Sequence, residues 1–290
     1  MGAADVVPGV SGGTIAFISG IYEELLSSIR ACTPLALVSL FRDGPQIFWR
    51  RINGTFLSVL FSGILFSVAT LARLIVYLLD HQPLLLWSFF FGLIVASILF
   101  IWRQLRRKGV WEYVFLLLGL CAALTSAFSP AVQLEPTMPV VFGAGMLAIC
   151  AMILPGISGS FILLLLGMYS VILGAVSAAD FSLLAIFALG CVAGLMVFSR
   201  LLSWLLSRFH GLTLSVLTGF LTGSLVMVWP WRESGMAVGE GHSAGLHLLT
   251  PVQYAQVLGD SRLPAALGLM LVGFILVLLL EYAGGRRTSF

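Results

Sequence analysis

Long apolar runs dominate the pattern of hydrophobic and polar positions along this chain. A helix needs roughly 20 mostly apolar residues to cross the hydrocarbon core of a bilayer. Six runs reach about that length: 52–79, 84–102, 111–129, 181–207, 211–230 and 262–282. They predict six transmembrane helices, and the first and fourth runs are long enough to tilt or break.

Two further apolar stretches, 1–29 and 140–174, are interrupted near their centres by similar sequences. The first contains VVPGVSGGT around Pro8, and the second contains ILPGISGSF around Pro155. Proline and paired glycines break a helix, so each half is too short to cross alone. We predict a re-entrant hairpin for each stretch, which turns near the midplane at its proline and leaves on the side where it entered.

Two segments near the N-terminus do not fit a spanning helix. Residues 31–50 are too polar and too interrupted by proline to span, and they predict an interfacial connector. The part of the first hairpin before Pro8 is only about 10 Å of helix, so we expect native residues upstream of Met1. The first residues also lack the basic region and cleavage site of a secretory signal, and the first membrane segment is expected to direct insertion.

The composition agrees with a membrane protein. The chain has 290 residues, of which 60% are hydrophobic and 9% charged, and its mean hydropathy is +1.08. A soluble domain carries about 25% charged residues, so much of this surface must face lipid. The net charge of +3 is small and gives no sign of nucleic-acid binding.

The distribution of Lys and Arg predicts which side of the membrane each connecting segment faces. With the N-terminal side placed in the cytoplasm, the cytoplasmic segments hold eleven of the 15 basic residues, and the outer loops hold only Arg232 and Arg262. Cytoplasmic loops carry an excess of Lys and Arg. We therefore predict that both termini and the 103–110 loop lie inside, and that 231–261 lies outside.

The sequence repeats itself at two offsets. Residues of 1–29 match residues of 140–174 at an offset of 147, including the Pro, Gly and Ser of both turns. Residues 71–79 (LARLIVYLL) match 198–206 (FSRLLSWLL) at an offset of 127. The offset changes because the first half carries the extra connector.

Each half holds one re-entrant hairpin and three spans, so the second half is inverted relative to the first. The sequence predicts an all-α integral membrane protein with one transmembrane domain of two inverted repeats, 1–139 and 140–290. The first hairpin then enters from the cytoplasm and the second from outside. This architecture is typical of secondary transporters.

The two turns are candidate anion sites. A helix begins after each turn, near Thr14 or Ser160, and the N-terminus of a helix attracts anions. The candidate phosphate ligands in the turns are Gly9, Ser11, Gly12, Gly13, Thr14, Gly156, Ser158, Gly159 and Ser160. Alternatively, these residues only permit tight packing, although packing alone does not need such similar residues twice.

Three charged residues complete the candidate site. Arg73 and Arg200 occupy equivalent positions inside predicted spans. Arginine is costly in a membrane and matches phosphate with a bidentate fork. We interpret the pair as anion clamps; the alternative is that each side chain snorkels to an interface. Asp5, which has no counterpart in the second half, is a candidate for coupling to an ion, for pairing with an arginine or for capping a helix.

An enzyme is a competing hypothesis. The GVSGG that starts at Gly9 satisfies the nucleophile-elbow pattern and resembles the serine motif of rhomboid proteases. A serine nucleophile needs a base, but the four histidines lie in predicted loops or at span ends, and Ser160 breaks the pattern in the second copy. An intramembrane serine hydrolase is therefore the less favoured alternative.

Other chemistry finds no support in the sequence. It holds no P-loop, HExxH motif or paired intramembrane carboxylates, so we expect no cofactor, no metal site and no ATP-driven transport by this chain alone. The four cysteines form no CxxC pair, and we interpret them as small core residues.

The segments GAADVVPGVSGGTIAFISGIYEELL and ILPGISGSFILLLLGMY resemble the two hallmark segments of a bacterial polytopic family, the PopT-type undecaprenyl phosphate translocases. The resemblance extends over essentially the whole chain and departs from the family at the short N-terminus. It implies a flippase in the bacterial cytoplasmic membrane. Such a protein returns undecaprenyl phosphate from the outer to the cytoplasmic leaflet for peptidoglycan and other envelope polymers. We expect alternating access coupled to an ion gradient, with a proton or a sodium ion as the candidate.

The lipid phosphate also fits the residues. A monophosphate head suits an arginine and helix-end clamp, while the polyprenyl tail stays in lipid. A secondary transporter of small organic or phosphate-bearing anions is a close alternative on the same architecture. The coupling ion, the exact lipid and the oligomeric state stay open.

Overall fold

A computed structural model describes the chain in segments: 1–2, 11–32, 42, 44–105, 109–129, 132, 134–232, 248–257 and 260–285. Three residues of the candidate site, Asp5, Pro8 and Gly9, lie outside the described residues.

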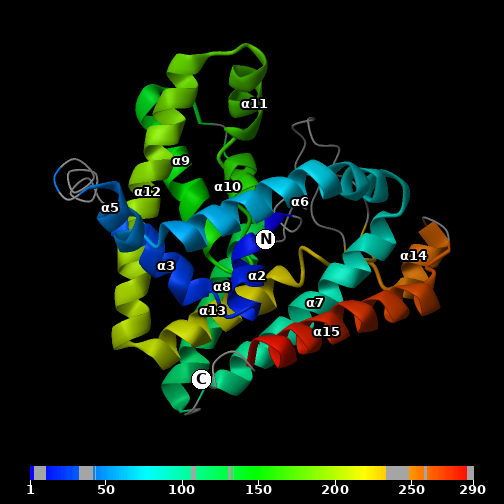
Figure 1. The fold of residues 1–290 in the computed structure, drawn as a ribbon. Helices are drawn as coiled ribbons and strands as arrows, with labels where there is room; N and C mark the ends of the chain where they lie inside the picture. Colours follow the sequence, from blue (N-terminus) through cyan, green and yellow to red (C-terminus); the bar gives the residue numbers. More distant parts are fainter. Residues whose placement is uncertain are drawn as a thin grey trace.

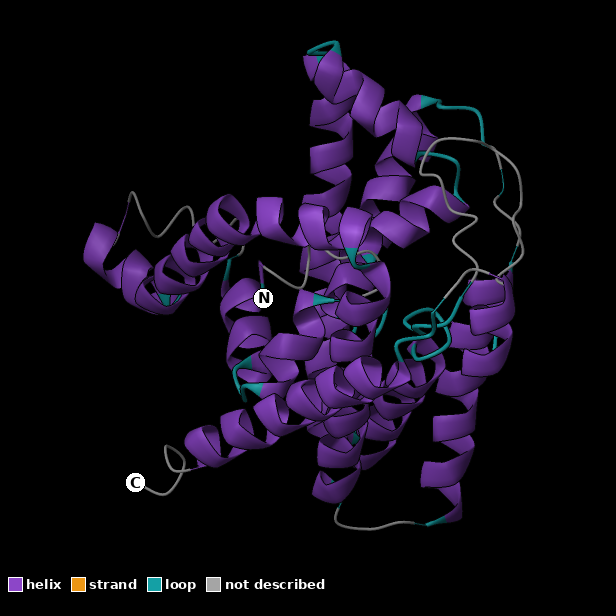
Figure 2. Ribbon diagram, turned by 90° about the vertical axis from the view of Figure 1, so that its right-hand side faces the viewer, coloured by secondary structure: helices purple, strands orange, loops and turns teal. Residues whose placement is uncertain are grey.

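Every regular element in these segments is a helix, and one isolated antiparallel bridge joins Arg232 to Leu248 (Figures 1 and 2). The helices are α2 (Gly12–Ile18), α3 (Tyr22–Ala31), α5 (Pro45–Arg51), α6 (Gly54–His81), α7 (Pro83–Gln104), α8 (Val110–Phe128), α9 (Met138–Ile153), α10 (Gly159–Leu165), α11 (Tyr169–Ser177), α12 (Phe181–Arg208), α13 (His210–Ser224), α14 (Pro251–Val257) and α15 (Leu263–Gly285).

In the described segments five helices are long and apolar enough to cross a membrane, namely α6, α7, α8, α12 and α15. The bent pair α10 and α11 makes a sixth if it counts as one span. The run at 211–230 differs from the expectation, because α13 ends at Ser224 after 15 residues. Its end tightens into i→i−3 hydrogen bonds from the backbone N–H groups of Leu225 and Val226, and Pro230 follows, which has no N–H to donate.

Helix boundaries recur at the two sequence offsets. At 147 residues, α2 corresponds to α10 from first residue to last, and α3 and α11 both begin at a tyrosine. A glycine in the left-handed region separates α2 from α3 and another separates α10 from α11. These are Gly20 at φ +74° and Gly167 at φ +68°. At 127 residues, α6 corresponds to α12 from first residue to last. The backbone therefore repeats where the sequence repeats.

Long helices of one half pack against long helices of the other half. α7 packs along α15, and α13 packs along α8, so each pair joins the second long helix of one half to the third of the other. Glycine permits both approaches: a Cβ on Gly92 would lie 1.9 Å from the carbonyl oxygen of Met270, and a Cβ on Gly219 would lie 2.1 Å from that of Leu116. This reciprocity supports the internal repeat, whereas the opposite membrane orientation of the halves stays a prediction.

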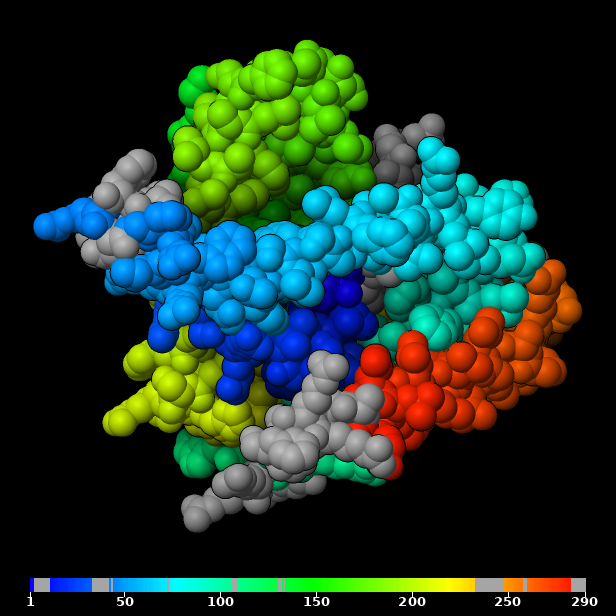
Figure 3. Space-filling model, viewed as in Figure 1, coloured from blue at the N-terminus to red at the C-terminus, as the bar shows by residue number. Residues whose placement is uncertain are grey.

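The α6 helix is the exception to this symmetry. It lies across the face of the molecule in Figure 3, and only 6% of its span-length segment is buried. A Cβ on Gly63 of α6 would have no neighbour within 4 Å, whereas one on its counterpart Gly190 of α12 would lie 2.1 Å from the carbonyl oxygen of Phe142 in α9. The counterpart of α9 at the offset of 147 residues lies mostly outside the described residues, although Gly2 approaches α6 closely, since a Cβ on it would lie 2.6 Å from the carbonyl oxygen of Ile64.

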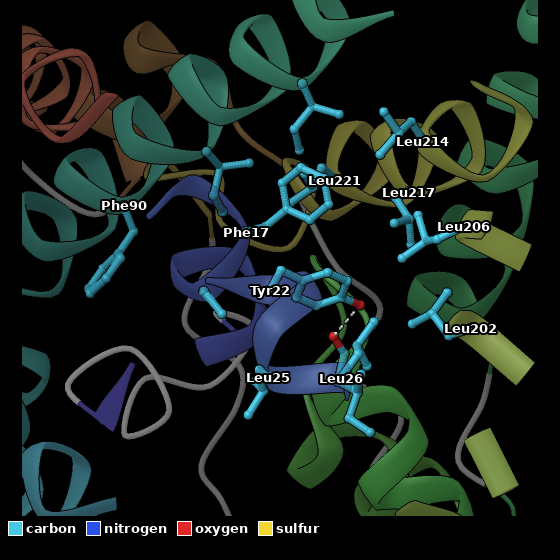
Figure 4. Packing of buried hydrophobic residues seen from close by; sticks show 14 of the residues in the cluster. Phe17, Tyr22, Leu25, Leu26, Phe90, Leu202, Leu206, Leu214, Leu217 and Leu221 are labelled. Atoms are coloured by element: carbon cyan, nitrogen blue, oxygen red, sulfur yellow. Dashed lines mark hydrogen bonds between the residues drawn. The ribbon is translucent and has the colours of Figure 1, made fainter. Parts of the chain in front are cut away.

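The main core lies between the first hairpin and the long helices. Side chains of α2 and α3, such as Phe17, Tyr22 and Leu26, pack with leucines of α12 and α13 (Figure 4). This core fixes the position of the short broken helices on which the candidate site is built.

Candidate functional site

The two Pro-Gly-Ser-Gly turns, which lie far apart in the sequence, touch each other in the structure. The side chains of Ser11 and Thr14 in the first turn are each 1% exposed, and that of Ser158 in the second is 9% exposed. No water reaches most of this contact, so its polar groups must find partners within the protein. The hydrogen bonds among these groups determine how the site can bind a ligand.

Residues of the first hairpin cap the C-terminal end of α9. The last carbonyl groups of a helix have no partner within the helix. Here the hydroxyl of Ser11 donates to the carbonyl oxygen of Met152 over 2.9 Å, and the hydroxyl of Tyr22 donates to that of Ile153 over 3.1 Å (Figure 4). Two residues of one repeat therefore cap a helix of the other.

A third hydrogen bond joins the turns in the opposite sense. The backbone N–H of Gly156, in the second turn, donates to the hydroxyl oxygen of Thr14 over 3.2 Å. Gly156 itself has φ +89°, a conformation that favours glycine, and it lies against Leu221 of α13. The three bonds hold the two turns together, and the last of them joins a candidate ligand of each turn.

Glycine allows the turns to come this close. A Cβ on Gly13 would lie 2.5 Å from the carbonyl oxygen of Ile153, across the contact between repeats. A Cβ on Gly159 would lie 2.6 Å from the carbonyl oxygen of Ala148 in the neighbouring leg of its own hairpin. Gly12 is the buried first residue of α2. At Gly13 and Gly159 the absence of a side chain allows two backbone segments to approach closely.

The hydroxyls of the two turns are engaged differently. Ser11 caps α2 by accepting from the backbone N–H of Gly13 over 3.1 Å. Its counterpart Ser158 makes no such cap, and instead its hydroxyl lies 2.8 Å from that of Ser160. The second turn therefore holds two hydroxyls that bind each other, and this pair can reorient toward a ligand without breaking a bond to the opposite repeat.

The structure does not bring the two arginines to the turns. Arg73 on α6 and Arg200 on α12 are both exposed. Arg73 lines a shallow surface groove with Tyr77, Asp80 and His81 of the same helix. In this structure the arginines thus present their charge at the surface, outside the buried contact between the turns.

Sequence reasoning missed Tyr22. Its side chain is 2% exposed and its hydroxyl is one of the bonds that join the repeats. The signal was present, because Tyr22 matches Tyr169 at the offset of 147 residues. Since no polar pattern marks an isolated tyrosine as part of a site, only the fold reveals its partner.

The cysteine interpretation is partly wrong. All four cysteines are free thiols, but Cys32 and Cys121 are exposed instead of lying in the core. Cys32 directly follows α3, and Cys121 lies on α8, whose span is only 11% buried. Cys150 and Cys191 are half-buried between α9 and α12.

The geometry suits reversible binding of an acceptor-rich group better than covalent chemistry. The hydroxyl of Ser11 donates to a backbone carbonyl, and no described histidine is bonded to it. Every buried side-chain nitrogen or oxygen among the described residues has a hydrogen-bond partner. An anion can therefore reach the turn hydroxyls only by replacing the bonds that they now make.

Comparison with known proteins agrees with the sequence resemblance. The chain matches the family described as undecaprenyl phosphate translocase-like over residues 1–244. It is 48% identical over 286 residues to a polyprenyl-phosphate transporter of Vibrio cholerae, and the alignment covers 97% of this chain and 93% of the relative. It is 31% identical over 250 residues to a polyprenyl-phosphate transporter of Staphylococcus aureus, covering 79% of this chain and 83% of the relative.

No solved structure matches the chain. The family and both relatives carry the names of transporters, which decides against the serine hydrolase.

Proposed function

This chain belongs to the undecaprenyl phosphate translocase-like family, and from that premise we propose that it carries polyprenyl phosphate across a bilayer. Its apolar helices and its family make it a multi-pass membrane protein.

The contact between the two turns is the observation that carries the proposal. In the described state Ser11, Thr14 and Gly156 bind across the repeats. We propose that the turns part to admit the phosphate, whose oxygens then take the N–H and O–H donors of the turns. Phosphate offers several strong acceptors, so the two donors released when the turns part, the Ser11 hydroxyl and the Gly156 N–H, find a new partner, whereas the carbonyl oxygen of Met152 must be met by another donor. Because the same N–H and O–H groups can bind the substrate, the contact between the turns can open without leaving buried donors unpaired.

The arginines act outside this contact. Because Arg73 and Arg200 are exposed here, they meet the head group before it enters the turns or after it leaves them. Their equivalent positions favour one arginine serving each side of the membrane as the inverted halves rock. Lysine keeps the charge but not the planar fork, so Arg-to-Lys at either position is expected to weaken transport, whereas a snorkelling arginine tolerates lysine.

The direction and location follow from the charge distribution and from the family. We propose a bacterial cytoplasmic membrane, both termini in the cytoplasm, and return of undecaprenyl phosphate from the outer to the inner leaflet for envelope polymers such as peptidoglycan. The structure offers one support: Arg262 donates to the side chain of Gln82 over 2.5 Å, so two segments assigned to the outside lie together. Movement against a gradient requires coupling to a proton or sodium ion, for which Asp5 is the candidate carboxylate.

Transport by purified protein in liposomes tests the proposal. Thr14→Val keeps the shape of the side chain and removes its hydroxyl. A hydrogen bond to a charged group contributes about 1.5–3 kcal/mol, so we expect uptake of labelled polyprenyl phosphate to fall by roughly tenfold or more. The control is Thr125→Val, because Thr125 is exposed on α8 and bonds only within its own helix.

Two outcomes would contradict the account. Normal uptake by Thr14→Val at matched reconstitution would make the turns packing devices only. Equal uptake of a small organic phosphate without a polyprenyl tail would favour the small-anion transporter instead.

A further inference from the structure

A second cationic feature lies outside the turns, where α13 ends. Arg232 was expected in an outer loop, but the structure folds it back over α7, and its guanidinium carbon lies 4.0 Å from the centre of the Trp87 ring. One terminal nitrogen of the guanidinium donates to the carbonyl oxygen of Met227. Trp87 is 5% exposed, so the cation rests on an aromatic face that is otherwise buried.

The described residues supply no counter-charge for this arginine. Among the described residues no carboxylate pairs with Arg232, and burial lowers the pKa of its guanidinium to about 10. The group therefore stays protonated at neutral pH while its hydration is reduced, a costly arrangement for an unpaired charge. Within the described residues the guanidinium makes no hydrogen bond other than the one to Met227, so the rest of its donor fork is free to bind a ligand.

Indole rings hold the chain in place around this cation. The indole N–H of Trp229 donates to the carbonyl oxygen of Leu249 over 2.9 Å, and that of Trp231 donates to the carbonyl oxygen of Ser261 over 3.1 Å. These bonds pin residues 225–232 to the segments that precede α14 and α15. The position of the guanidinium is thus fixed before any ligand arrives, which lowers the entropic cost of binding.

An apolar cluster adjoins the aromatic residues. Trp231 packs with Leu84 and Ala266, and partly buried neighbours extend that cluster: Leu85, Trp229, Tyr254 and Met270. A guanidinium fork beside aliphatic and aromatic side chains suits an amphiphile with an anionic head and a hydrocarbon tail. A polyprenyl phosphate has both parts.

This feature is not repeated in the other half. At the offset of 127 residues Trp229 corresponds to Trp102, but Arg232 corresponds to Leu105 and Trp87 corresponds to Leu214. At this offset the pair formed by Arg232 and Trp87 therefore has no counterpart in sequence. The charge distribution assigns the end that holds this pair to the outside, where a lipid carrier awaiting return would be met.

We propose that Arg232, held on Trp87, is a second phosphate-binding site that captures polyprenyl phosphate at the outer end before the head group reaches the turns. This inference rests on the proposed function and adds a substrate-capture step to it. Capture raises occupancy at low lipid concentration, so its loss should raise KM and leave the maximal rate nearly unchanged. Variants of the turns should instead lower the maximal rate.

Binding to the purified full-length chain in detergent tests the site. Farnesyl phosphate is the probe, with inorganic phosphate and farnesol as its separate halves, and intrinsic tryptophan fluorescence is the readout. We expect saturable binding of farnesyl phosphate, weaker binding of inorganic phosphate and no saturable change with farnesol. Arg232→Gln should raise the Kd of farnesyl phosphate by about tenfold or more, as expected when a charge-assisted fork is lost.

The controls separate the site from general charge and from folding. Arg262→Gln removes the other outer arginine, whose side chain is exposed and bonds to Gln82, and it should bind as the wild type does. If Arg232→Gln elutes as an aggregate, Arg232→Lys takes its place, since lysine keeps the charge over the indole ring but not the fork. Trp87→Phe should abolish most of the fluorescence change and retain binding measured by equilibrium dialysis.

The outcomes are decisive in both directions. Wild-type affinity in folded Arg232→Gln or Arg232→Lys overturns the site, as does an equal loss in Arg262→Gln. If Arg232→Gln leaves binding and KM unchanged while Thr14→Val stops transport, the capture site fails and the proposed function stands. If the wild type binds farnesyl phosphate through Arg232 but liposomes show no transport, the proposed function fails instead.

Discussion

The hydrogen bond from Tyr22 to the carbonyl oxygen of Ile153 gives a sharp test of the contact between the repeats. Tyr22→Phe removes only the hydroxyl, because the ring stays packed against Phe17 at a centroid distance of 5.1 Å. The acceptor is the last residue of α9, and no other donor to it is present among the described residues. The substitution therefore leaves a buried carbonyl group without a partner.

The expected cost follows from burial. Leaving a buried donor or acceptor unsatisfied costs about 1–3 kcal/mol of the free energy of unfolding. Each kcal/mol corresponds to about 2–4 °C in the melting temperature of proteins of 150–250 residues. We therefore expect Tyr22→Phe to melt several degrees below the wild type when both are purified in the same detergent and unfolding is followed by intrinsic fluorescence.

A second tyrosine provides the control. Tyr113 on α8 is 50% exposed, so Tyr113→Phe should melt with the wild type. If Tyr22→Phe also melts with the wild type, the hydroxyl does not hold the repeats together and the first hairpin does not cap α9. A large loss in both variants would indicate a general effect of the tyrosine hydroxyl and would equally refute the reasoning.

Two further predictions concern topology and packing. In a variant without native cysteines, Gln253→Cys should react with an impermeant thiol reagent in intact cells and Gly109→Cys should not; the reverse pattern would overturn the orientation of both halves. Gly190→Ala should lower the melting temperature, because its Cβ would lie 2.1 Å from a carbonyl oxygen of α9 and overpacking costs about 1–3 kcal/mol. Gly63→Ala, at the equivalent position of α6, faces open space and should be tolerated; equal loss in both would show that the two halves pack alike.

The long helices could be predicted from the sequence because the length of an apolar run is enough to indicate a spanning helix. The runs at 52–79, 84–102 and 181–207 begin and end within about two residues of α6, α7 and α12, within the usual uncertainty of helix ends. The run at 211–230 shows that the length of an apolar run does not always predict the length of its helix. Its apolar residues continue past Ser224, but they fold into a turn held by tryptophan hydrogen bonds, and hydropathy does not distinguish the two.

Only part of the candidate site could be predicted from the sequence. The doubled Pro-Gly-Ser-Gly motif marked Ser11, Thr14 and Ser158 as candidates because similar residues recur at the offset of 147. It could not show that the hydroxyls of Ser11 and Thr14 bind the opposite turn, since such pairs depend on how the halves pack. The burial of Arg232 was also invisible, because a charged residue in a loop is normally solvated and only tertiary structure places it over Trp87.

The central claim is that this protein moves the phosphate head group of a polyprenyl lipid from one leaflet to the other. Liposomes that carry labelled polyprenyl phosphate in both leaflets, with an impermeant phosphatase added outside, test that claim most directly. With the wild-type protein reconstituted, the account predicts that the phosphatase removes head groups from the entire lipid pool, because inner-leaflet lipid reaches the outside. Cleavage that stops at the outer-leaflet share, as in liposomes without protein, would contradict it.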